Sequence, residues 1–115
     1  MEPIEVRVMN YLKENLDVPV FPNEPDLTKY QSFVVFEKTG SSDENQLNSC
    51  TMVVQSYGKT LYDAITLNSQ VINVMKRMHE RNDISRSKCE TDYNFTDQNK
   101  KIHRYQAVFD LGFYE

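Results

Sequence analysis

The sequence has few of the residues that build easily recognised sites. Its 115 residues include no tryptophan, three glycines, two cysteines and two histidines. No apolar run approaches the ~20 residues of a membrane-spanning helix, and the acidic N-terminus lacks a signal-peptide pattern. We therefore expect one domain over residues 1–115, with a modest core, no membrane partner, and synthesis and function on the cytosolic side.

The residues that most often carry chemistry are not grouped along the chain. Neither Cys50 and Cys89 nor His79 and His103 have the spacing of metal ligands. We expect two reduced, partly buried thiols. No local histidine or carboxylate pair is placed for acid–base or nucleophilic catalysis, although residues far apart in the chain can still meet in the fold. We therefore predict no enzyme activity, no metal and no cofactor.

The segment Gly58-Lys59-Thr60 matches the end of a phosphate-binding loop. That motif also needs a glycine five positions before Gly58, and Val53 stands there. The glycines that would wrap a phosphate are therefore missing. A turn followed by a helix cap accounts for all three residues.

Charge is distributed unevenly between the two halves of the chain. Residues 1–71 contain 5 basic and 10 acidic side chains, whereas residues 72–115 contain 8 and 7, and the formal net charge is −4. An acidic first half argues against tight binding to nucleic-acid phosphates. The basic cluster from 76 to 88 is more simply a helix C-terminus followed by a solvated loop.

Hydrophobic periodicity predicts two helices and four main strands. Proline at position 3 suits a helix start, and Pro19 ends that helix because the residue before a proline avoids the helical region. The predicted helices span 3–16 and 60–81, the strands span 30–37, 47–57, 88–95 and 102–114, a short edge strand lies at 20–21, and the connecting loops or turns lie at 22–26, 39–45, 82–87 and 96–101.

The second helix follows the central strand and organises the domain. Thr60 is predicted to cap it, with Asp63 as the partner in a capping box. Its apolar residues recur at helical spacing, and we expect Ile65 and Ile72 to be buried. The predicted apolar stripe consists of Leu61, Ala64, Ile65, Asn68, Val71, Ile72, Met75 and Met78.

The order of elements, α-β-β-α-β-β, predicts an α+β fold. We expect an antiparallel sheet of about four strands, with two helices packed mainly on one face. In the predicted strand 30–37, Phe33 and Val35 point to one face, while Val34 and Phe36 point to the other. Two helices on one side cannot cover both faces, so we expect a neighbouring subunit to cover the second face.

Five segments of the chain, in order, resemble the small tail-terminator, or head–tail joining, proteins of long-tailed siphophages. The pieces Glu-Lys-Thr-Gly and Gln-Ser-Tyr are the most specific parts, and the resemblance covers nearly the whole chain. The segments are Asp17–Pro22, Phe33–Gly40, Val54–Ala64, Tyr93–Phe95 and Arg104–Asp110.

This resemblance implies a ring. Such proteins cap the head-proximal end of the tail tube, stop its polymerisation and present a surface to the head-completion protein. It implies a structural virion protein of the neck, a homo-hexameric ring, and no catalytic residues. DNA would only pass through the ring lumen, and an acidic lining of 39–47 would repel its phosphates. A plain solvated hairpin tip explains that loop equally well. Candidate ring or tube contacts are Phe33, Val35, Asp43, Glu44 and Asn45.

Two other functions remain open at this point. One is a different neck component, a head-completion or stopper protein of similar size. The other is a small nucleic-acid-binding or regulatory domain that uses the basic residues from Lys76 to Arg86.

Overall fold

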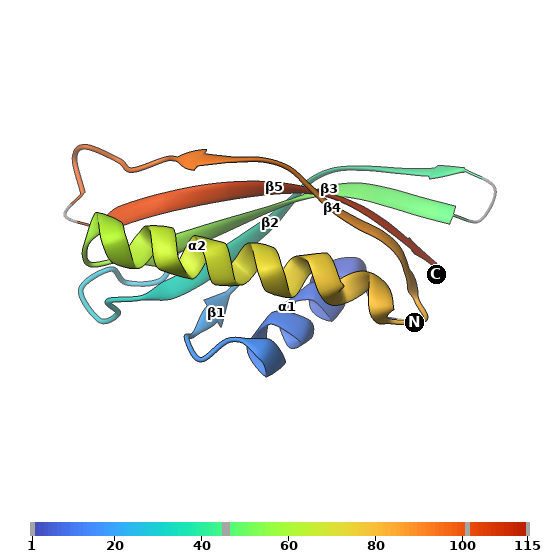
Figure 1. The fold of residues 1–115 in the computed structure, drawn as a ribbon, viewed down its shortest axis with the longest axis horizontal. Helices are drawn as coiled ribbons and strands as arrows, with labels where there is room; N and C mark the ends of the chain where they lie inside the picture. The colour runs from blue at the N-terminus through green and yellow to red at the C-terminus, as the bar shows by residue number, and fades with distance from the viewer. Residues whose placement is uncertain (1, 45–46, 101, 115) are drawn as a thin grey trace.

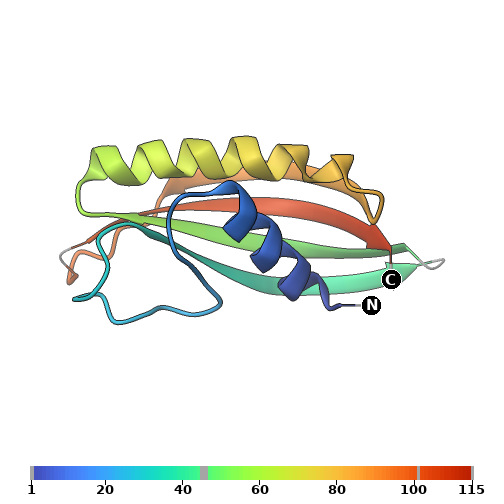
Figure 2. The ribbon, with the colours of Figure 1, turned by 90° about the horizontal axis from the view of Figure 1, so that it is seen from below.

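A computed structural model describes residues 2–44, 47–100 and 102–114 of the chain. Two helices lie on one side of a long twisted sheet (Figures 1 and 2). The α+β class predicted from the sequence is therefore confirmed. The elements are α1 (Ile4–Asn15), β1 (Val20–Phe21), β2 (Phe33–Glu44), β3 (Leu47–Gly58), α2 (Leu61–Lys76), the 3₁₀ helix η1 (Arg77–Glu80), β4 (Ile84–Asn94) and β5 (His103–Tyr114).

The described sheet has five strands in the order β1-β2-β3-β5-β4 and is mixed. The prediction of about four antiparallel strands is wrong in this detail. Strand β1 pairs with β2 in parallel, with Val20 opposite Val34, whereas β2, β3, β5 and β4 pair antiparallel with their neighbours. The parallel pair forms because the chain turns back through the loop 22–32 before it enters β2 in the same direction.

Strands β2 and β4 extend further than the sequence pattern predicts. Residues 39–44 were expected in a loop, yet Gly40 to Glu44 continue β2 opposite Thr51 to Leu47 of β3. In the same way β4 begins at Ile84, inside the predicted linker, because it pairs with Phe113 of β5. A polar sequence is compatible with a strand when a neighbouring strand supplies the backbone hydrogen bonds.

The start of α2 confirms the predicted cap, but the buried face is rotated from the predicted one. The Thr60 side chain accepts a hydrogen bond from the backbone N–H of Asp63 over 3.1 Å. Ile65, predicted to be buried, is 43% exposed, and Ile72 is only partly buried. The stripe that faces the sheet consists of Ala64, Leu67, Asn68, Val71, Val74, Met75 and Met78.

The larger core lies between the sheet and the two helices. Side chains of β2, β3 and β5 on this side, among them Val34, Met52 and Phe109, pack against both helices. The Tyr11 hydroxyl joins the helices directly, because it donates a buried hydrogen bond of 2.6 Å to the Val74 carbonyl. The helices therefore form one layer, and the other face of the sheet needs a different cover.

Candidate interaction surfaces

The second face of the sheet is covered by the chain itself where Phe33 and Val35 lie. Both side chains are buried, at 0% and 7% exposure, in a second core with Tyr57 and Ile102. The expectation that a neighbouring subunit must cover this face is therefore wrong. The loop 22–32 folds over it and adds apolar side chains, with flanking contacts from Phe21, Leu27 and Tyr30.

A polar network joins this covering loop to the sheet. The Tyr57 ring stacks on Phe33 at a centroid distance of 4.4 Å, and its hydroxyl donates to Glu24 Oε2 over 3.0 Å. Lys100 donates to Glu24 over 2.9 Å, and Arg104 Nη1 donates to the Tyr57 hydroxyl over 3.2 Å. Burial raises the pKa of Tyr57, while the Lys100 hydrogen bond lowers the pKa of Glu24. The network stabilises the loop without providing a reactive group.

The predicted contact residues Asp43 and Glu44 lie at the end of β2, in the part of the β2–β3 hairpin that is farthest from Phe33. Asp43 is exposed in β2 and pairs with Asn48, and nearby the Ser42 and Ser49 hydroxyls share a 2.8 Å hydrogen bond. The backbone of Glu44 ends β2, whereas Asn45 falls outside the described residues. The structure therefore places Phe33 and Val35 apart from Asp43, and the predicted contacts do not form one surface.

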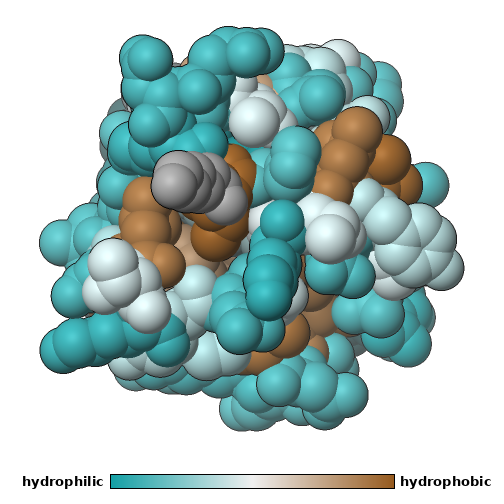
Figure 3. Space-filling view, turned by 90° about the vertical axis from the view of Figure 1, so that its left-hand side faces the viewer, coloured by the Kyte–Doolittle hydropathy of each residue, from teal (hydrophilic) through white to brown (hydrophobic). Residues whose placement is uncertain are grey.

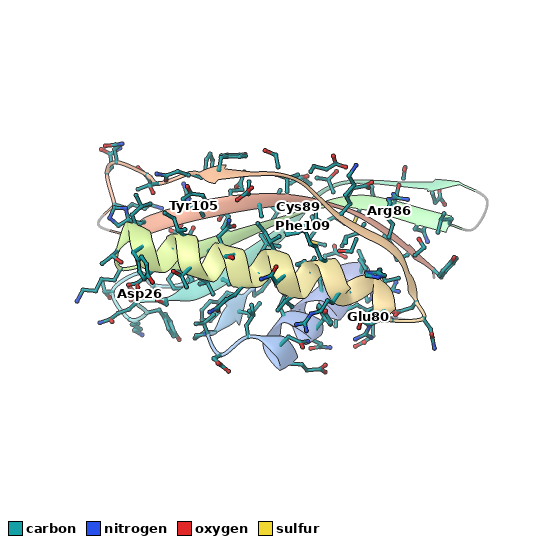
Figure 4. The ribbon with its side chains drawn as sticks, in the orientation of Figure 1. Asp26, Glu80, Arg86, Cys89, Tyr105 and Phe109 are labelled. Atoms are coloured by element: carbon teal, nitrogen blue, oxygen red, sulfur yellow. The ribbon has the colours of Figure 1, made fainter. Side chains whose placement is uncertain are left out.

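The end of the sheet where β4 begins also carries most of the basic residues between positions 76 and 88. Arg86 makes two hydrogen bonds to Asp110, of 2.8 and 3.0 Å, on the face opposite the helices (Figure 4). Arg81 contacts Asp83 over 3.3 Å. These two arginines are engaged with carboxylates, which weakens the case for a nucleic-acid-binding surface.

Gly58, at the end of β3 just before α2, is explained by the close packing around it. A side chain at Gly58 would place its Cβ 2.5 Å from the backbone nitrogen of Ala64 and 2.8 Å from Cβ of Asp63. Gly58 therefore allows the first turn of α2 to pack directly against the end of β3. This contact, together with the Thr60 cap, accounts for Gly58-Lys59-Thr60 without a bound phosphate.

Within residues 2–44, 47–100 and 102–114, no group of three or more potential metal ligands comes together. His79 contacts the carbonyl of Lys76 in its own helix end over 2.5 Å. Cys50 is buried and Cys89 is partly buried, and both thiols are free. Burial raises the pKa of Cys50 to about 11, which makes its thiol a poor nucleophile.

The burial of Arg7 was not predicted, and Asn68 was predicted on the apolar stripe of α2 without a hydrogen-bond partner. Arg7, 4% exposed, lies on the apolar side of α1, where Ile4, Val8 and Tyr11 set the helical spacing. Asn68, 3% exposed, lies on the buried stripe of α2 and donates to Asp92 Oδ2 over 2.9 Å. A polar residue at a buried helical position was the available signal for both.

The face opposite the helices remains partly open towards the middle of the sheet. There a row of polar side chains crosses three strands, because Gln55 donates to Gln106 over 2.8 Å and Gln106 donates to Tyr93 over 2.6 Å. This row fixes the side chains of neighbouring strands and leaves the face polar.

The described residues offer no helix long and apolar enough to cross a membrane.

Comparison with known proteins gives no independent indication of function. No model of a known protein family matches the chain, and no curated protein matches its sequence.

Proposed function

We propose that the chain is a ring-forming tail terminator, a structural protein of the neck of a long-tailed bacteriophage. Six copies form a ring that caps the tail tube and joins the tail to the head. Its partners are further copies of itself, the tail tube protein and the head-completion protein, and DNA passes through the lumen. The protein acts in the virion after assembly in the bacterial cytoplasm, and its role is structural rather than enzymatic.

The convergence of the five segments that resemble tail terminators carries this proposal. They lie far apart in the sequence, yet they occupy neighbouring strands of one sheet. Val20 pairs with Val34, Phe33 with Tyr57, Tyr57 with Arg104 and Asn94 with Tyr105. The segments that carry the resemblance thus pair with one another across the sheet, and one of them continues through the turn into α2.

The far end of the β2–β3 hairpin supports the proposal in a second way. It extends beyond the end of α2 (Figure 1), and residues 39–43 are exposed. The exposed carboxylate of Asp43 suits a hairpin that lines the lumen, because an acidic surface repels DNA phosphates. The proposal therefore assigns this hairpin to a contact with a ring or tube neighbour, or to the pore lining.

A charge reversal tests the role of the hairpin. Asp43→Lys should leave the domain folded, because the side chain is exposed, but should impair virion assembly or DNA ejection in a complementation assay. Glu14→Lys makes the same change of charge at an exposed position of α1 and should be neutral. Normal assembly and ejection with Asp43→Lys would remove the hairpin from the proposed function.

A further inference from the structure

An apolar stripe of α2 remains partly uncovered beside strand β4. Leu61, Ile65, Asn68 and Ile72 recur at steps of four, three and four residues, so they share one side of the helix. Asn68 fixes that side, because its amide donates to Asp92 of β4 over 2.9 Å. Leu61 is 38% exposed, Ile65 is 43% exposed and Ile72 is partly buried. Figure 3 views the end of the molecule where α2 begins and shows hydrophobic groups among polar ones there.

Strand β4 is also an edge of the described sheet. It pairs with β5 on one side, and no described strand lies on the other. An unpaired edge exposes backbone N–H and C=O groups that another strand can satisfy. The uncovered stripe of α2 and this edge together form what we call the β4 surface: the edge of β4 with Leu61, Ile65 and Ile72.

The opposite edge of the sheet has the same combination of features. Strand β1 covers β2 only at Val34 and Val35, so the described part of the sheet leaves β2 unpaired on that side from Phe36 onward. Beside this edge lies a largely apolar groove of about 290 Å³ under α1. We call this edge and its groove the β2 surface; the groove is lined by Glu5, Val6, Met9, Pro22, Phe36, Glu37 and Lys38.

The β2 and β4 surfaces lie at the same height along the strands. Phe36 in the groove pairs with Val54, which pairs with Ala107, which pairs with Asp92. Asp92 in turn contacts Asn68, in the middle of the α2 stripe. Both apolar regions also lie on the helix side of the sheet, because Phe36 belongs to the core beneath the helices.

We propose that the β4 surface of one copy binds the β2 surface of a second copy, head to tail. The occupant is a second copy because one chain carries both complementary surfaces at matching heights. A rotation about an axis parallel to the strands brings them together without a shift along the axis, and repetition of that rotation closes a ring. The strands so joined run antiparallel. This inference rests on the proposed function only for the closure into a ring; the contact between copies is tested separately.

Self-association of the purified chain is the direct measurement. In a dilution series of amide NMR spectra from millimolar to micromolar concentration, resonances of β4, of the α2 stripe and of the β2 edge should shift, while those of residues 26–32 should not. Ile65→Lys should lower the association constant at least tenfold. Thr66→Lys adds the same charge at an exposed position outside the stripe and should leave association unchanged.

A mixing experiment distinguishes this head-to-tail contact from a symmetric one. Val6→Lys blocks the β2 surface and leaves the β4 surface intact; Glu37→Lys, at an exposed position of the same edge, replaces it if Val6→Lys fails to fold. Each single variant should be monomeric, whereas Val6→Lys mixed with Ile65→Lys should form a one-to-one dimer that does not grow. Unchanged association of Ile65→Lys, self-association of Val6→Lys, or no association of the parent chain at millimolar concentration would overturn the inference. Tail length in a phage lacking the protein tests the proposed function independently.

Discussion

Arg7 of α1 donates a hydrogen bond of 3.1 Å to Asp83, which lies 76 residues later in the turn before β4. The same guanidinium donates to the Tyr114 carbonyl over 2.9 Å and lies 5.1 Å from the centre of the Phe113 ring. One buried arginine therefore holds together the first helix, the turn after α2 and the last strand. Those segments meet at the far end of the sheet, close to the basic start of β4.

Replacement of this arginine should be costly. Arg7→Met removes the hydrogen bonds to Asp83 Oδ2 and to the Tyr114 carbonyl, so the free energy of unfolding should fall by roughly 2–4 kcal/mol. Arg81→Met is the matched control, because Arg81 contacts the same carboxylate while its side chain is 40% exposed. It should cost less than about 1 kcal/mol. Equal losses in urea denaturation would contradict a special role for Arg7.

The contact should also make stability depend on pH. Partial burial raises the pKa of Asp83, but hydrogen bonds from Arg7 and Arg81 outweigh this and hold it below the usual 3.8. A lowered carboxyl pKa stabilises the fold above the unfolded pKa, and this stabilisation is lost as the pH falls through the folded pKa. Asp83→Asn should therefore be less stable than the parent at neutral pH, and the difference should shrink below about pH 4. A difference independent of pH would argue against the ion pair.

The corrected face of α2 gives a second stability test. Leu67 is 5% exposed and lies on the core side, so Leu67→Ala should lower the free energy of unfolding by roughly 2–5 kcal/mol. Ile65→Ala removes a side chain that is 43% exposed, and it should cost less than about 1 kcal/mol. Thermal or denaturant melts of the two variants compare them directly. A larger loss with Ile65→Ala would restore the face predicted from the sequence.

The two thiols should react at different rates with an alkylating reagent. Cys50 is 4% exposed and has its pKa raised to about 11, mainly by burial. Burial also raises the pKa of Cys89, with a further contribution from Asp92, but Cys89 is only partly buried. Peptide mapping by mass spectrometry should find Cys89 modified roughly ten times faster or more. Equal rates in the native protein, followed by equal rates in urea, would contradict the described burial of Cys50.

Local sequence patterns predicted most helix and strand positions, because apolar spacing and helix caps depend on residues that are close together in the chain. The apolar spacing along α1, the cap at Thr60 and the alternation along β5 each follow from the periodicity of one element. The rotation of α2 did not follow, because Ile65 and Leu67 are both large and apolar. Which of them faces the sheet depends on how the helix packs, and the sequence of one helix does not contain that information.

The ends of β2 and the cover over Phe33 depended on partners distant in the chain. Residues 39–44 are polar and include Gly40, a composition typical of a loop, yet pairing with β3 makes them a strand. Only residues 22–26 were predicted to form a polar loop, and the next strand was predicted to begin at Tyr30. The strand begins at Phe33 instead, and Leu27 and Tyr30 pack over the second core from the loop. Apolar residues in an otherwise polar, proline-rich loop were the signal that this face has an intramolecular cover.

The candidate contact surfaces were predictable only in part. Asp43 was identified from its place in a polar, acidic stretch, and it is exposed as expected. The match in height between the β2 and β4 surfaces arises from the register of four strands, from Phe36 across to Asp92. No single segment of the sequence carries that relationship.

Electron microscopy of tails from cells infected with a phage that lacks this gene tests the central claim most directly. Without a terminator the tube has no stop, so tails should be overlong, variable in length and not attached to heads. Complementation with the parent chain should restore one uniform length. Tails of normal, uniform length beside heads that have lost their DNA would contradict the terminator role and indicate a head-completion protein instead.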